Sequence, residues 1–227
     1  MAKINTLLLD LDGTLVDSVP DLAASVNFAL GTIDHPSREQ AEIRQWVGNG
    51  VDRLLHRAIT ASSDGVADAQ LHQRAVQGVE FWYRHHYADQ SRLYEGVTEL
   101  LAALQLRGFK MACVTNKPHP FTLPLLTKFA IDHYFQAVIG GDSTAARKPD
   151  PLPLLTALDQ LDSTANESVM IGDSINDFLA GQRSGMATIM VSWGYSQGID
   201  LDNLGADGLV QQIGQLLPLI DTLGGPE

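Results

Sequence analysis

Short runs of apolar residues recur along this chain and alternate with longer segments whose apolar residues return every three or four positions. Runs of the first kind are typical of buried strands, and the longer spacing is typical of helices. The predicted strands are Thr6–Leu11, Met111–Thr115, Ala137–Ile139, Ser168–Ile171, Thr188–Val191 and Gly208–Val210. The predicted helices are Val97–Leu106, Phe121–Phe129, Leu152–Leu161 and Ile175–Ser184, with a final one near the C-terminus. This alternation predicts an α/β fold with a mostly parallel sheet that helices cover on both faces.

The segment 18–87 breaks this alternation, because none of its apolar runs has the character of a strand. Apolar residues with helical spacing occur instead in four stretches, at Leu22–Leu30, Ile43–Val47, Val51–Ile59 and Val76–Trp82. We therefore predict an α-helical cap domain over residues 18–87, inserted after the first strand of a Rossmann-like core made of residues 1–17 and 88–227. The linkers between the two are expected at Val16–Ser18 and Ala88–Glu95.

Composition narrows the class of function. The chain has 227 residues, of which 44% are hydrophobic and 19% charged, as in globular proteins. Its formal net charge is −12, so it lacks the excess of basic residues that is typical of proteins that bind nucleic acid or anionic membranes. No apolar stretch approaches the ~18 residues of a membrane span, and no signal-peptide pattern opens the chain. The single cysteine, Cys113, excludes an internal disulfide and a zinc site built from cysteines. We expect a cytoplasmic protein with no nucleic-acid or membrane partner.

Residues able to perform chemistry follow several of the predicted strands. In open parallel sheets, ligands bind where the carboxyl ends of the strands meet, so side chains in these loops are expected to lie close together. The candidates are Asp10 and Asp12 in Asp10-Leu11-Asp12-Gly13-Thr14, Thr115 and Asn116 in Thr115-Asn116-Lys117, Lys148 in Arg147-Lys148-Pro149, and Asp173 and Asp177 in Gly172-Asp173-Ser174-Ile175-Asn176-Asp177.

The residue types in these loops favour phosphate chemistry at a metal. Asp10 and Asp12 are two positions apart, so on an extended backbone their side chains point the same way and can share a pocket. With Asp173 they provide the hard oxygen ligands that Mg²⁺ prefers, and a cation relieves their mutual repulsion. Lys148 can bring an ammonium group, and Thr115 a hydroxyl group, to a phosphate. Each carboxylate alone could be a solvated loop residue or a helix cap, but their occurrence together at separate strand ends favours catalysis.

These motifs resemble those of the haloacid dehalogenase (HAD) superfamily, whose members are mostly phosphatases. Its first motif is matched by DLDGT, its second by Thr115, its third by Lys148 and its fourth by GDSIND. The helical insert after the first strand resembles the cap of that superfamily. Within it, bacterial enzymes that hydrolyse 2-phosphoglycolate are similar to this chain at WVGNGVDRLL, VTNKPHPF and VIGGDSTAARKPDPLPLL, and the match is poorest over residues 60–77.

The resemblance implies a Mg²⁺-dependent phosphatase that hydrolyses 2-phosphoglycolate to glycolate and phosphate. It implies that Asp10 is the nucleophile that becomes an aspartyl-phosphate, and that Asp12 serves first as general acid and then as general base. Thr115 and Lys148 would stabilise charge on the phosphate oxygens. The Mg²⁺ ion would be held by the side chains of Asp10 and Asp173 and by the backbone carbonyl of Asp12.

Three further residues have roles that depend on their surroundings. We expect Asn116 to contribute to substrate binding. Lys117 either approaches the substrate or is simply exposed. Asp177 lies one helical turn after Asp173 and would orient a metal-bound water or Lys148, unless it forms a salt bridge within its own helix.

A glycine turn in the insert offers a second binding element. Gly48, Asn49 and Gly50 precede the predicted helix at Val51, and a turn of this kind presents free backbone N–H groups to an anion. We expect this turn, together with Arg53, to receive the carboxylate of the substrate. The alternative is an ordinary turn that connects two helices.

Other functions compatible with these motifs are a phosphatase or phosphomutase for another small phosphate, such as a sugar phosphate or nucleotide, and a phosphate-sensing module without turnover. A dehalogenase is disfavoured, because hydrolysis of a carbon–halogen bond needs neither Mg²⁺ nor the acid role of Asp12. The expected partner is a small phosphorylated organic acid, and the expected oligomeric state is a monomer or a weak homodimer.

Overall fold

A parallel sheet runs through the larger part of the molecule. The computed structural model describes residues 3–196 and 198–225. The sheet contains β1 (Thr6–Leu9), β4 (Lys110–Val114), β5 (Ala137–Ile139), β6 (Ser168–Gly172), β7 (Ala187–Val191) and β8 (Gly208–Val210). Its strand order is β5-β4-β1-β6-β7-β8, so the chain builds outward from β1 first in one direction and then in the other. This reversal beside β1 is the place where open α/β sheets bind ligands, and the predicted α/β fold is confirmed.

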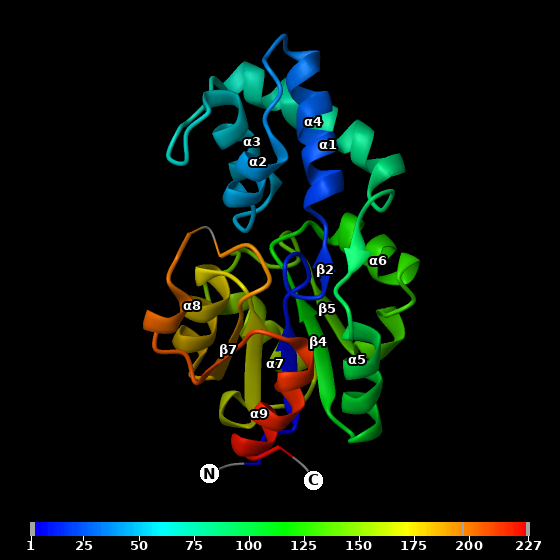
Figure 1. Ribbon diagram of the computed structural model, residues 1–227, viewed down its shortest axis with the longest axis vertical. Helices are drawn as coiled ribbons and strands as arrows, with labels where there is room; N and C mark the ends of the chain where they lie inside the picture. The colour runs from blue at the N-terminus through cyan, green and yellow to red at the C-terminus, as the bar shows by residue number, and fades with distance from the viewer. Residues whose placement is uncertain (1–2, 197, 226–227) are drawn as a thin grey trace.

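Helices cover both faces of the sheet (Figure 1). They are α5 (Val97–Leu106), α6 (His119–Lys128), α7 (Leu152–Gln160), α8 (Ile175–Ser184) and α9 (Leu216–Thr222), with short 3-10 turns at Asp132–Tyr134, Ala165–Glu167, Leu201–Asn203 and Ile213–Gln215. Successive side chains of a strand point to opposite faces. Leu7 and Leu9 of β1 therefore pack into a core with α5, α6 and α9, whereas Leu8 packs with α7 and α8. Burial on both faces explains why the strands are apolar at almost every position.

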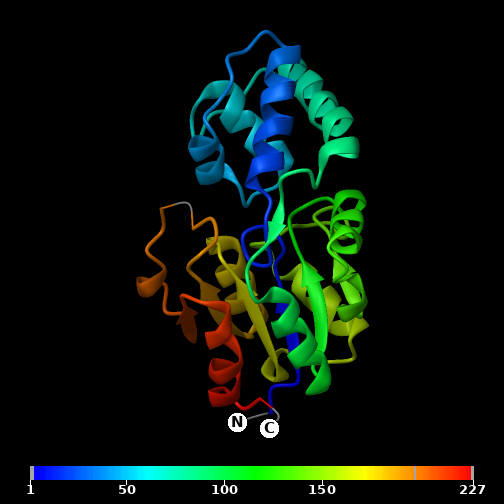
Figure 2. The ribbon, with the colours of Figure 1, turned by 45° about the vertical axis from the view of Figure 1, so that its right-hand side comes forward.

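The insert after β1 forms helices, as its spacing predicts. They are α1 (Val19–Thr32), α2 (Gln40–Trp46), α3 (Val51–Thr60) and α4 (Ala69–His86). They lie together beyond the carboxyl ends of the strands (Figures 1 and 2) and share an apolar core that includes Leu30, Ile43, Leu55 and Tyr83. None of the described helices is long and apolar enough to span a bilayer. The division of the chain into core and cap domains at residues 17 and 88 stays a prediction.

The chain enters and leaves the helical insert through paired segments. Strand β2 (Val16–Asp17) pairs antiparallel with β3 (Arg92–Leu93), and the pairs are Val16 with Leu93 and Asp17 with Arg92. The two predicted linkers therefore run side by side. This pairing brings the start of α1 and the end of α4 to the same place above the sheet.

Candidate active site

The loop after β1 begins at the edge of the sheet and turns back at once. Asp10 still donates its backbone N–H to Ile171 of β6, at 3.0 Å, but β1 ends at Leu9 instead of the predicted Leu11. Leu11 remains buried, yet its carbonyl accepts from the N–H groups of a tight turn, which explains why the apolar run outlasts the strand. Gly13 within this turn has a φ of +92°, and a Cβ there would lie 2.3 Å from Asp173 Oδ2. Only glycine permits this close approach.

A pocket lies between the carboxyl ends of the strands and the helical insert. Most of the predicted site residues line it, and they are Asp10, Asp12, Thr115, Asn116, Lys148, Asp177, Gly48 and Gly50. Lys117 lines it as well. The insert adds an apolar wall made of Leu22, Val47, Val51, Leu54, Val79 and Tyr83. The structure thus brings together polar residues from separate strand ends beneath an apolar cover, an arrangement typical of small-molecule sites.

Three buried carboxylates meet beside this pocket. Oxygen atoms of Asp10, Asp173 and Asp177 all lie within 4.8 Å of one another. Burial raises the pKa of Asp10 to about 7, although the neighbouring Lys148 ammonium opposes this rise. Burial, followed by the negative charge of Asp10, also raises the pKa of Asp173 well above its usual value. Such a cluster favours either protonation or a cation, and its oxygen ligands fit a hard divalent ion such as Mg²⁺.

Asp173 is held by residues from two distant loops. Its Oδ1 accepts from Thr14 Oγ1 at 2.9 Å, and its Oδ2 accepts from the backbone N–H of Tyr195 at 2.6 Å. The Tyr195 hydroxyl in turn accepts from the N–H of Ser18 at 2.9 Å and donates to Asp17 at 2.7 Å. Tyr195 therefore connects the acidic cluster to the linker that enters α1. Thr14 belongs to the DLDGT motif, so the sequence could indicate that it lies at the site. Tyr195 belongs to no motif and could not be identified in this way.

Lys148 partly neutralises the acidic cluster. Its Nζ lies 3.0 Å from Asp10 Oδ1 and 2.6 Å from Asp177 Oδ1, and it donates to the carbonyl of Val114 at 2.5 Å. Burial acts to lower the pKa of Lys148, but the carboxylates of Asp10 and Asp177 outweigh it and hold that pKa above its usual value. Lys148 is therefore a cation fixed directly beside the expected nucleophile.

Asp177 has two partners. One oxygen pairs with Lys148, and the other accepts from the N–H and the hydroxyl of Ser174, which closes a capping box at the start of α8. The capping contact locks the side chain in the orientation that meets Lys148. Of the roles considered for Asp177, this geometry favours the orientation of Lys148 over an ion pair inside α8.

The Asp12 side chain turns away from the acidic cluster. Its Oδ1 accepts from Ser18 Oγ at 2.6 Å, and both of its carboxylate oxygens lie 3.3 Å from Lys117 Nζ. Lys117 is buried, with 6% of its surface exposed, so the alternative that it is an exposed residue is wrong. It also donates to the hydroxyl of Tyr83 from α4 at 2.7 Å. Asp12 therefore faces the pocket side that the insert covers.

The predicted glycine turn rests on the core. Asn116 Nδ2 donates to the carbonyls of Gly48 and Lys148, both at 2.9 Å, and Asn176 Nδ2 donates to Gly48 at 3.1 Å. Asn49 makes a longer contact of 3.4 Å to Asn176 and does not line the pocket. Helix α3 begins directly after Gly50, which has a φ of +83°. The glycines of the turn form part of the pocket wall, and a role of the turn in binding a carboxylate stays a prediction.

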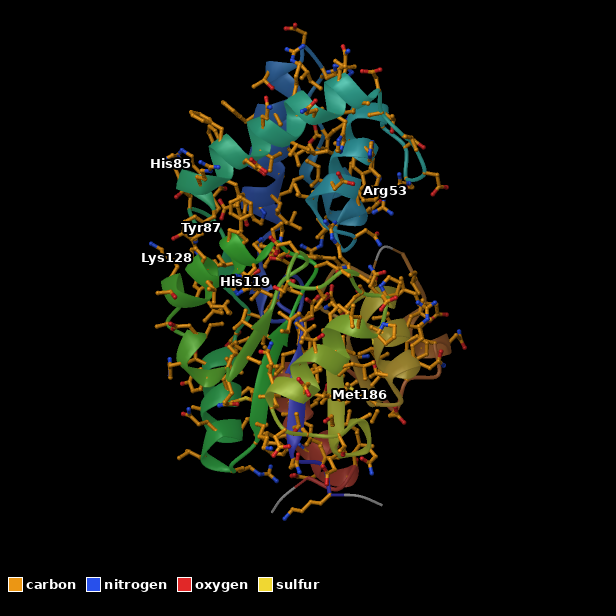
Figure 3. All side chains as sticks on the ribbon, turned by 180° about the vertical axis from the view of Figure 1, so that it is seen from behind. Arg53, His85, Tyr87, His119, Lys128 and Met186 are labelled. Atoms are coloured by element: carbon orange, nitrogen blue, oxygen red, sulfur yellow. The ribbon has the colours of Figure 1, made fainter. Side chains whose placement is uncertain are left out.

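Arg53 is not brought to the pocket. Its guanidinium donates to the carbonyls of Ser63 and Gly65, at 2.7 and 2.8 Å, in the loop after α3 (Figure 3). Val51 and Leu54 face the pocket, and a helix turns by about 100° per residue, so Arg53, which is one residue before Leu54 and two after Val51, points away from it. The expectation that Arg53 helps to receive a carboxylate is therefore corrected: Arg53 anchors a loop in this structure.

Comparisons with known proteins agree with this fold. A model of the family described as haloacid dehalogenase-like hydrolase matches residues 7–191. A protein named phosphoglycolate phosphatase from Nitrosococcus oceani is 38% identical over 94% of this chain and 95% of its own length. One of the same name from Colwellia psychrerythraea is 40% identical over 93% and 94%. A crystal structure of a predicted phosphoglycolate phosphatase from Haemophilus somnus superposes with a TM-score of 0.89 at 31% identity, covering 96% of this chain and 99% of that one.

The matched region contains the Asp10 loop, the Thr115 strand end, Lys148 and the Asp173 loop that the pocket brings together. The family match thus extends over the residues that form the candidate site. This chain belongs to the haloacid dehalogenase-like hydrolase family.

Proposed function

We propose that this protein is a Mg²⁺-dependent phosphatase that hydrolyses 2-phosphoglycolate to glycolate and phosphate. One observation carries the proposal: the buried Asp10 carboxylate shares a pocket with the Lys148 ammonium, 3.0 Å away, beside the carboxylates of Asp173 and Asp177. This arrangement can bind a phosphate dianion and place a nucleophile against it. The names of the relatives in Nitrosococcus oceani and Colwellia psychrerythraea support phosphoglycolate as the substrate.

The first half of the reaction transfers the phosphoryl group to Asp10. A carboxylate oxygen of Asp10 attacks phosphorus, and the bond between phosphorus and the ester oxygen breaks. Asp12 gives a proton to the departing alkoxide of glycolate. Lys148 and the hydroxyl of Thr115 offset the negative charge on the phosphate oxygens. The products of this half are an aspartyl-phosphate and glycolate.

The second half restores the enzyme. Asp12, now a carboxylate, takes a proton from water, and the water oxygen attacks phosphorus. The bond between Asp10 and phosphorus breaks, so inorganic phosphate leaves and Asp10 is a free carboxylate again. Asp12 carries the proton needed for the next cycle, and one water is consumed in each turnover.

The Mg²⁺ ion would be held by the side chains of Asp10 and Asp173 and by the backbone carbonyl of Asp12. When bound, it supplies positive charge that offsets the repulsion between a carboxylate nucleophile and a phosphate dianion. The turn of the Asp12 side chain toward Lys117 agrees with a ligand role for the Asp12 backbone only. The hydrogen bonds from Thr14 and Tyr195 keep Asp173 oriented for this role.

Residues 18–87 would act as a cap over this site. The insert contributes an apolar wall to the pocket, and its Gly48-Asn49-Gly50 turn is bonded to Asn116 and Asn176 of the core. A cap in this place limits the access of bulk water to the site and contacts the part of the substrate remote from phosphorus.

A substrate panel tests the proposal most directly. We expect purified protein to release phosphate from 2-phosphoglycolate with a higher kcat/KM than from glucose 1-phosphate or mononucleotides. A preference for a sugar phosphate or nucleotide would replace the proposed substrate while leaving the phosphatase in place. Absence of turnover with every ester, including a generic aryl phosphate, would instead favour a phosphate-sensing module.

Removal of metal is expected to abolish turnover. Dialysis against EDTA should leave no measurable phosphate release, and added Mg²⁺ should restore it, because Lys148 neutralises the buried carboxylates only in part and their remaining charge repels the phosphate. Binding should also stabilise the fold, by about 2.7 kcal/mol at roughly 100 times the Kd. Thermal unfolding with and without Mg²⁺ measures this effect, and an Asp173→Asn variant should lose it. Full activity of the EDTA-treated protein would contradict the metal assignment.

Gly194 is expected to be essential for the orientation of Asp173. A Cβ at this position would lie 2.3 Å from Asp173 Cβ and 2.4 Å from the carbonyl of Gly13, so Gly194→Ala must displace a residue beside the acidic cluster. We expect the affinity for Mg²⁺, measured by calorimetry, to fall about 10- to 100-fold. Gly214→Ala is the matched control, since a Cβ there meets no atom within 4 Å. Equal Mg²⁺ affinities for both variants would contradict this expectation, because they would show that the loop accommodates the Cβ of the Gly194→Ala variant without displacing Asp173.

A further inference from the structure

A second buried ammonium group lies in the pocket, apart from the one beside Asp10. Lys117 lines the pocket from the loop after β4, and its Nζ contacts the Asp12 carboxylate and the hydroxyl of Tyr83. Its charge also lies 4.7 Å from the centre of the Tyr83 ring. Burial of an ammonium group is costly unless its partners compensate for lost water. We therefore ask which function the buried ammonium group of Lys117 serves.

Two of the three contacts of Lys117 Nζ are long enough to give way to another acceptor. An ammonium offers three N–H donors, and the described contacts of Nζ are the Tyr83 hydroxyl at 2.7 Å and the two oxygens of one carboxylate at 3.3 Å. Strong charge-assisted hydrogen bonds are shorter, at about 2.7–2.9 Å, so the pair with Asp12 is a loose one. Lys117 can accept a further anion as a partner without first breaking a tight ion pair.

Among the residues that the structure describes, the cations that line the pocket are Lys117 and Lys148. Lys148 contacts Asp10, Asp177 and the carbonyl of Val114, on the side of the pocket where the phosphate is expected to bind. The guanidinium of Arg53 is bonded to the 61–68 loop. A second negative group on the substrate would therefore meet Lys117.

The chemistry of the substrate sets where such a group would lie. In the proposed reaction Asp12 contacts the ester oxygen that leaves phosphorus. In 2-phosphoglycolate the carboxyl carbon is bonded to the carbon that bears this oxygen, so its carboxylate must lie close to the Asp12 side chain. Lys117 is the cation found there, 3.3 Å from both Asp12 oxygens.

We propose that Lys117, held by Tyr83 of the insert, is the receptor for the substrate carboxylate, and that the enzyme selects phosphate esters of 2-hydroxy acids. The inference rests on the proposed function and names the residue that gives it selectivity. Because Lys117 belongs to the core and Tyr83 to α4, recognition of the carboxylate would also depend on the insert being in place over the site. Tyr83 acts as a positioning residue, through Lys117.

The test compares two esters of similar size, 2-phosphoglycolate and 2-hydroxyethyl phosphate, which has a hydroxymethyl group in place of the carboxylate. We expect Lys117→Met to lower the ratio of their kcat/KM values on the order of 10²-fold, mainly through a higher KM for 2-phosphoglycolate. Lys128→Met is the matched control, since Lys128 lies exposed on α6 (Figure 3), and its ratio should equal that of the wild type. An equal loss with both esters would overturn the proposal.

A second variant covers the case in which Lys117→Met does not fold. Tyr83→Phe removes one hydroxyl and keeps the ring, and we expect it to raise KM for 2-phosphoglycolate about 3- to 10-fold with little change in kcat. An unchanged KM would count against the proposal. The wild-type ratio separates this inference from the proposed function: a wild type without preference for 2-phosphoglycolate overturns the substrate assignment, whereas a preference that survives in Lys117→Met overturns only the role of Lys117.

Discussion

Replacement of Asp10 by asparagine is expected to lower kcat for 2-phosphoglycolate on the order of 10⁴-fold or more. The amide is a poor nucleophile and cannot form the acyl-phosphate, so the two-step route is lost, while Thr115 and Lys148 still bind phosphate. Steady-state phosphate release measures the loss. Acid-quenched wild-type protein should carry one phosphate by mass spectrometry during turnover, and the variant should carry none. Turnover by a folded Asp10→Asn protein at the wild-type rate would remove the basis of the mechanism.

The same variant has a consequence for stability that serves as its folding control. Burial raises the pKa of Asp10 to about 7, so the metal-free folded state retains a proton that the unfolded chain releases near pH 4. The folded state binds more protons in this window, and its stability therefore falls as pH rises from about 4 to about 7. Asparagine avoids this loss. In EDTA, Asp10→Asn should have a higher Tm than the wild type above pH 7, and the difference should vanish below pH 4.

Replacement of Lys148 by methionine is expected to reduce kcat about 10²- to 10³-fold and to destabilise the protein. Its ammonium lies 3.0 Å from Asp10 and 2.6 Å from Asp177, so its removal leaves uncompensated buried carboxylates and costs roughly 3–5 kcal/mol of unfolding free energy. Denaturant titration measures the stability, and phosphate release measures the rate.

A double variant separates these two effects of Lys148. Lys148→Met combined with Asp177→Asn removes one of the stranded charges, and the asparagine can still accept from Ser174 at the start of α8. We expect the double variant to regain part of the lost stability without regaining activity. Recovery of both together would mean that Lys148 acts only by maintaining the fold, which would contradict its role beside the phosphate.

The main features of the fold follow from local patterns. Strands β5 and β8 and helices α5 and α8 have the predicted bounds. Short apolar runs indicate the strands of a parallel sheet, and apolar residues three or four positions apart indicate its helices. The helices of the insert also follow from spacing alone. The end of β1 does not, since Leu11 continues the apolar run while its carbonyl already closes a turn. Burial and strand pairing are separate properties, and hydrophobicity reports only the first.

What the sequence by itself determined is the set of candidate loops. DLDGT, Thr115 and the Asp173 loop lie at strand ends, which the topology of a parallel sheet brings together, and Lys148 lies between β5 and α7. Only the tertiary structure decided which cation faces the pocket from each side. Arg53 points to its own loop and Lys117 points inward, because the direction of a long side chain depends on contacts with residues far away in the chain. Tyr195, which is hydrogen-bonded to Asp173 and to Ser18 of the linker, likewise could be found only in the tertiary structure. Contacts with residues far away in the chain, and no local pattern, place it beside the acidic cluster.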